Sequence, residues 1–171
     1  MLRKSINYLA PLLLLIAFSL DGQLTTLLIN LSPGVISISS HLLLMVGIFC
    51  SFYLPLSYSL FLFAMLGFFY DIYYIDVIGM GVTLFPLVIY LVYYFYQYLK
   101  MRRVTNLIIL IVVIFVLKFS MFLLARLFHI SNLSMFLFVF YDLAPSLVFN
   151  SILLFLLHPM FEALFGFTNK T

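Results

Sequence analysis

The residues best suited to chemistry in this chain lie between Gly67 and Gly81. In the run Gly-Phe-Phe-Tyr-Asp-Ile-Tyr-Tyr-Ile-Asp-Val-Ile-Gly-Met-Gly, Asp71 ends an apolar stretch, Asp76 falls in a short loop and Gly79 opens the next apolar stretch. A carboxylate beside hydrocarbon costs free energy unless it has a partner, and such acids often carry ions or protons. Because the chain holds only five acidic residues, Asp71 is expected to pair with a base or to serve a function.

The glycines of this segment are expected to control how closely helices approach one another. Gly67 lies one helical turn before Asp71, so both fall on one face, and a small residue there lets another helix come close. This face is expected to pack within the protein or against a second protein, and the sequence leaves both open. Gly79 and Gly81 are expected to serve the entry into the following helix. The candidate packing or partner-interface residues are therefore Gly67, Asp71, Asp76, Gly79 and Gly81.

A second group of charged residues is expected to form ion pairs inside the membrane: Asp21, Lys118, Arg126 and Asp142. Arg126 and Asp142 flank a short turn and are expected to pair. Lys118 lies about 12 Å deeper than Arg126 at the rise of a helix, and Asp21 and Asp71 are the acids available to it. None of these acids falls near the membrane midplane, which argues against a proton or ion pathway.

The composition requires a membrane environment for the elements that hold these residues. Of the 171 residues, 67% are hydrophobic and 8% are charged, and the mean hydropathy is +1.30. A soluble domain of this size could not bury so much apolar surface. The apolar runs are continuous rather than alternating, which predicts helices. We therefore predict an all-α, polytopic integral membrane protein.

Six membrane segments are expected, and together they form a single bundle domain over residues 1–171. One helix over 38–71 would be roughly 50 Å long, well beyond a hydrocarbon core of about 30 Å. A turn is therefore expected near Pro55, since proline disfavours helical geometry in the residue before it. No small-residue cleavage site follows the first apolar run, so this helix is expected to be retained. The expected spans are about 6–28, 38–54, 56–71, 79–99, 104–128 and 135–158.

Basic residues orient this bundle. With six spans both termini lie on one side, and one face collects nearly all basic side chains. By the positive-inside rule that face, with both termini, is predicted to be cytoplasmic. The net charge of +3 is too small and too localised to indicate nucleic-acid binding, which leaves membrane lipid as the surrounding partner. The basic residues on this face are Arg3, Lys4, Lys100, Arg102, Arg103 and Lys170.

Enzyme and cofactor chemistry find no support in the sequence. Cys50 is the single cysteine, which excludes an intramolecular disulfide and a cysteine-based metal site. His41, His129 and His158 fall on different segments, so we expect no metal site. There is no phosphate-binding glycine loop, no nucleophile with an adjacent base and no carboxylate pair at catalytic spacing. We expect neither an enzyme nor a cofactor.

The Gly67-x-x-x-Asp71 element, with Gly79 after it and an apolar aromatic helix following, resembles the rod shape-determining protein MreD family. His158-Pro159 near the end of the last apolar segment also fits that family. The likeness in layout covers nearly the whole chain. The loop departs from the family's usual small-residue and proline pattern, because Tyr73, Tyr74 and Asp76 stand there.

This resemblance implies a non-enzymatic scaffold or adaptor of the bacterial machinery that elongates the cell wall and sets cell shape. It would lie in the cytoplasmic membrane as a multi-pass protein. The implied partners are an MreC-like single-span membrane protein, a RodA-like glycosyltransferase and a class B penicillin-binding protein. Partner contact is expected through the Gly67–Gly81 hairpin and the helix faces of the outer leaflet.

Two other functions remain open from the sequence. The substrate-binding membrane subunit of an energy-coupling-factor vitamin transporter also has six helices, and it needs a polar pocket near the outer face. The charged outer cluster is compatible with such a pocket. The Ala-x-x-x-Ala pairs that dock the coupling subunit are missing here. A small proton-coupled transporter is the third possibility, and the depth of the acids argues against it.

Overall fold

The protein is a bundle of helices. The computed structural model describes residues 2–32, 36–99 and 102–165, and all regular elements in these ranges are helical, which confirms the all-α prediction. Two short π-helical segments, η1 (Asp71–Ile75) and η2 (Phe138–Leu143), continue α3 and join α6 to α7. The α-helices are α1 (Leu2–Leu31), α2 (Leu42–Ser51), α3 (Leu56–Tyr70), α4 (Met80–Tyr98), α5 (Arg103–Leu127), α6 (Met135–Leu137) and α7 (Ala144–Phe165).

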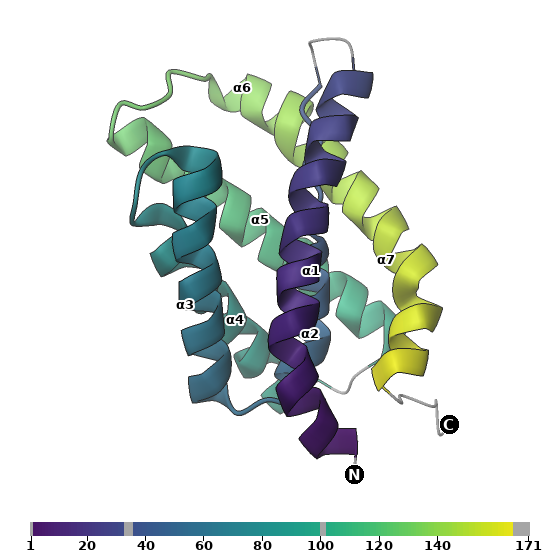
Figure 1. The fold of residues 1–171 in the computed structure, drawn as a ribbon. Coiled ribbons are helices and arrows are strands. Elements are labelled where there is room, and N and C mark those ends of the chain that lie inside the picture. Colours follow the sequence, from purple (N-terminus) through teal and green to yellow (C-terminus); the bar gives the residue numbers. More distant parts are fainter. Residues whose placement is uncertain (1, 33–35, 100–101, 166–171) are drawn as a thin grey trace.

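Five helices in the described ranges are long and apolar enough to cross a membrane, so the chain is a multi-pass membrane protein. The chain runs up and down the bundle, and its two ends lie at the same end of it (Figure 1). We call this the inner end, following the predicted orientation, and the opposite end the outer end. Arg102 and Arg103 lie at the inner end, whereas Lys100 and Lys170 of the expected basic face lie outside the described residues.

The expected continuous helix over 38–54 is wrong. The chain is extended over residues 36–41 and becomes helical only in α2. Serine and β-branched residues fill the extended part, and both types have low helix propensity. Six extended residues cover about 20 Å and ten helical residues about 15 Å, so this combination still reaches across the bundle.

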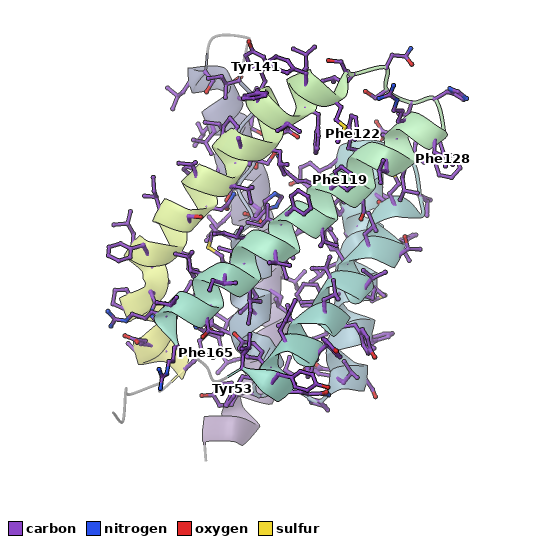
Figure 2. The ribbon with its side chains drawn as sticks, turned by 180° about the vertical axis from the view of Figure 1, so that it is seen from behind. Tyr53, Phe119, Phe122, Phe128, Tyr141 and Phe165 are labelled. Carbon is purple, nitrogen blue, oxygen red and sulfur yellow. The ribbon has the colours of Figure 1, made fainter. Side chains whose placement is uncertain are left out.

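The last pass also differs from expectation, because its helix does not end near residue 158. α7 continues through Pro159 to Phe165, seven residues beyond the expected end of the span. Tyr53, in the turn between α2 and α3, donates a hydrogen bond to the carbonyl of Phe165. Figure 2 shows both aromatic side chains together at the inner end. This contact fixes the end of α7 to the turn that begins α3.

α2 forms the centre of the bundle. All ten of its residues are buried, and it packs against α1, α4, α5 and α7. A helix that is apolar on every side is expected in such a position. Phe49 stacks on Phe161 of α7 with ring centroids 4.7 Å apart, so this short helix is enclosed by protein.

Gly67 and Gly81 bring α3 and α4 into direct backbone contact. A Cβ atom at Gly67 would lie 2.8 Å from the backbone nitrogen of Val82, and one at Gly81 would lie 2.8 Å from the carbonyl oxygen of Gly67. Side chains do not tolerate such distances to a rigid backbone. The two helices can therefore pack this closely only while both positions are glycine.

Replacing Gly67 by alanine is expected to destabilise the protein by roughly 1–3 kcal/mol, because the added methyl group forces α3 and α4 apart. The measurement is the apparent melting temperature of the purified protein in detergent. Ser57→Ala, at an exposed position of α3, is the control and should melt like the wild type. An unchanged melting temperature for Gly67→Ala would show that the helices separate without cost.

Candidate functional site

Asp71 binds the start of α4. Its carboxylate accepts hydrogen bonds from the backbone N–H groups of Gly79 at 2.8 Å, Gly81 at 2.6 Å and Val82 at 3.2 Å. The side chain is 0% exposed. The first N–H groups of a helix have no partner within it and carry partial positive charge. A carboxylate placed there accepts hydrogen bonds from these N–H groups and carries the opposite charge.

The hairpin between α3 and α4 places the carboxylate of Asp71 at the start of α4. The π-helical turn η1 starts at Asp71, and the chain then reverses through Asp76 and Gly79, whose φ angles are 57° and 128°. Both values lie in the left-handed region, which glycine adopts freely and aspartate tolerates. Gly67, Asp71, Gly79 and Gly81 thus lie together, while Asp76 is exposed at the tip of the hairpin.

The expectation that Asp71 pairs with a base is wrong, since three backbone amides take the place of the cation. Because the carboxylate is fully buried, Asp71 itself offers no surface to a partner. The exposed tip of the hairpin is therefore the part that could contact a partner, and this interface stays a prediction.

Removing the carboxylate of Asp71 is expected to cost roughly 1–3 kcal/mol, because buried backbone N–H groups lose their acceptor. Asp71→Ala should lower the melting temperature more than Asp71→Asn, which retains one acceptor oxygen. Asp76→Asn is the matched control and should have little effect, because asparagine also tolerates the left-handed region. Equal melting of Asp71→Ala and Asp76→Asn would contradict the capping role.

Asp21 caps the start of α2 as Asp71 caps the start of α4. Its carboxylate accepts hydrogen bonds from the backbone N–H of Leu42 at 2.5 Å, the N–H of Leu43 at 2.8 Å and the hydroxyl of Ser40 at 2.7 Å. The expected ion pair between Asp21 and Lys118 is therefore wrong. Two helices that begin inside the outer half of the bundle are each capped by an acid from the preceding helix.

Side chains from distant helices satisfy the backbone of the extended segment. Exposed peptide groups cannot exist in hydrocarbon, so irregular backbone at this depth must be bound by protein. Ser40 donates its N–H to Thr25 of α1 at 3.0 Å, and His41 donates its N–H to the side-chain oxygen of Asn150 at 2.8 Å. The remaining bonds run from Ser37 N–H to Tyr141 O, from Ser39 N–H to Ser146 Oγ, and from Asn150 Nδ2 to Ser39 O.

The ion pair of the outer half joins the buried Lys118 to the half-buried Asp142. The Nζ–Oδ1 distance is 2.6 Å, and Lys118 also donates to Ser146 Oγ at 2.8 Å. The expected pair of Arg126 and Asp142 is therefore wrong. Eight residues rotate a helix by about 80° beyond two full turns, so Arg126 does not share the inward face of Lys118, and it is exposed.

Neutralising Lys118 is expected to destabilise the fold by roughly 1–3 kcal/mol, because the buried ammonium group then no longer binds the half-buried Asp142 and the hydroxyl of Ser146. Lys118→Met should therefore melt well below the wild type. Arg126→Met, which removes an exposed charge from the same helix, should melt within about 0.5 kcal/mol of it. The assignment fails if Arg126→Met proves the more damaging change.

A cavity of about 850 Å³ lies between the outer half of α5, the segment from α6 to η2 and the extended segment. Tyr70 and Met80 close it on the side of the α3–α4 hairpin. Phe122 and Tyr141, which both line it, lie at the end of the bundle opposite Tyr53 and Phe165 (Figure 2). The cavity therefore belongs to the outer end, and Lys118 lies at its inner limit.

His41 has a side-chain nitrogen that is not hydrogen-bonded to the described residues. Its side chain is 8% exposed, and among the described residues its Nε2 atom has no hydrogen-bond partner. Sequence reasoning treated His41 only as a metal candidate. Asn150 and Ser146 were also missed, although an asparagine within an apolar helix is a signal of buried hydrogen bonding.

A separate polar group lies at the inner end. Arg103 binds Glu162 through two hydrogen bonds of 3.2 and 2.7 Å, and His158 lies 3.5 Å from the same carboxylate. His41 and His158 are thus far apart, and the described residues contain no cluster of three side chains that could hold a metal ion. This group ties the start of α5 to the end of α7.

The chain matches the model of a known protein family. The model of a family described as rod shape-determining protein MreD matches residues 4–168, nearly the whole chain. No curated protein and no solved structure matches the chain significantly.

Proposed function

This chain belongs to the rod shape-determining protein MreD family, and from that premise we propose that it is a non-enzymatic scaffold of the bacterial cell-wall elongation machinery. It would work in the cytoplasmic membrane beside an MreC-like single-span protein, a RodA-like glycosyltransferase and a class B penicillin-binding protein. Membership of the family gives the role in cell shape; the scaffold role and the partners are our proposal. The observation that carries it is the α3–α4 hairpin.

The engagement of the acidic residues supports a scaffold rather than an enzyme. Asp21 and Asp71 bind helix starts, Asp142 binds Lys118, and Glu162 binds Arg103. A general acid or base needs an ionisable group that can reach a substrate. Of the five acids only Asp76 is left without such a structural task among the described residues, and it stands exposed at the hairpin tip.

The hairpin offers a rigid platform for another membrane protein. The contact of Gly67 with Gly81 and the cap by Asp71 fix α3 against α4, so the exposed side chains at the tip are held in place. Tyr73 is 72% exposed and Ile78 is 65% exposed. Exposed aromatic residues on a fixed backbone are typical of protein interfaces, where they lose little entropy on binding. Asp76 adds a charge for specificity.

Tyr73→Ala and Asp76→Asn, which removes the charge and tolerates the same backbone conformation, test this proposal. Each is expected to reduce co-purification with the MreC-like protein of the same bacterium at least about tenfold, which corresponds to about 1.4 kcal/mol. Both variants should melt like the wild type, because both side chains are exposed, and cells that carry them should lose rod shape. Asn132→Ala, in the other exposed outer loop, is the control. Undiminished capture by both hairpin variants would refute the proposed surface.

A further inference from the structure

The outer cavity has one polar wall, built by the extended segment. Side chains alternate along extended backbone, so Ser37, Ser39 and His41 share one side, and all three line the cavity. Ser37 and Ser39 are half-buried, and the hydroxyl groups of this wall stand beside the His41 ring. A hydroxyl group can both donate and accept hydrogen bonds with a bound molecule.

The opposite wall is apolar. Met121, Phe122 and Ala125 share one face of α5 with Lys118 and line the cavity. Phe122 stacks on the buried Phe138 of η2 with ring centroids 4.3 Å apart, and this contact holds the half-buried ring of Phe122 in place. Cavities with apolar walls and a few convergent polar groups are the usual sites of small ligands.

The charges of the lining narrow the class of ligand. Lys118 and Asp142 are the charged residues of the lining, and they neutralise each other at 2.6 Å. A ligand with a net charge would therefore find no opposite charge that is free to pair with it. The apolar wall extends from Met121 to Ala125, toward the outer end.

We propose that this cavity binds a small amphipathic molecule of zero net charge that enters from the outer face. Its ring or short hydrocarbon body lies against Met121 and Phe122, and its hydrogen-bonding group reaches the hydroxyl groups of Ser37 and Ser39. This site goes beyond the scaffold role, because it needs no protein partner and does not involve the hairpin tip.

Thiol labelling of the full chain in lipid nanodiscs tests the site. In a Cys50→Ala background, Ser39→Cys places a thiol on the polar wall, and a charged methanethiosulfonate reagent reports its access to water. Benzamide is the probe, since it is neutral, aromatic and able to donate and accept hydrogen bonds. For a ligand of so few atoms a Kd of about 1 mM is expected, so about 10 mM benzamide should slow labelling roughly tenfold.

Matched probes and variants complete the experiment. Benzoate and benzylammonium, which keep the ring but carry a charge, should slow labelling much less. Asn132→Cys in the exposed outer loop should label at the same rate with and without benzamide. Ser37→Ala in the Ser39→Cys background should weaken the protection, and Ser37→Cys should be protected like Ser39→Cys.

Several results would overturn the proposal. Absence of labelling at Ser39→Cys and Ser37→Cys would show that the cavity is closed to water. Labelling that benzamide does not slow, or slows equally at Asn132→Cys, would show that no probe occupies it. Equal protection by benzoate or benzylammonium would contradict a site for neutral molecules. None of these results depends on partner capture, so they leave the scaffold proposal to its own test.

Discussion

The structure depends on the need to satisfy backbone amides inside hydrocarbon. Two helices, α2 and α4, begin within the outer half of the bundle, where water cannot bind their first N–H groups. Asp21 and Asp71 supply the acceptors, each from the helix that precedes the one it caps. The buried acids that first suggested ion chemistry are therefore part of the backbone hydrogen bonding, and the packing of Gly67 on Gly81 follows from the same hairpin.

Four of the five acids are bound within the protein, so the exposed surface and the outer cavity remain as the candidates for function. The Lys118–Asp142 pair closes one side of the polar network, and the Arg103–Glu162 pair holds the inner end. The hairpin tip presents exposed aromatic side chains outside the bundle, while the outer cavity presents hydroxyl and imidazole groups within it. Both lie toward the outer end, but they are formed by different segments and can act independently.

Local patterns in the sequence predicted the parts of the structure that local contacts determine. The continuous apolar runs predicted an all-α membrane bundle, and the spacing of Gly67, Asp71 and Gly79 singled out the hairpin whose polar contacts close within a few residues. The extended segment could not be predicted in this way, because its partners Ser146 and Asn150 lie more than 100 residues further along the chain. Arg126 and Asp142 were paired by proximity in sequence. The rotation of the helix instead places Lys118, and not Arg126, on the face toward Asp142.

The separation of these partners along the chain also sets an order of assembly. The cap on α4 can form as soon as residue 82 has left the ribosome, because Asp71 and its donors lie within eleven residues. The extended segment must wait for α7, since His41 and Asn150 are 109 residues apart. Because unpaired peptide groups are costly in hydrocarbon, the second pass can reach its final position only after the last helix has been inserted.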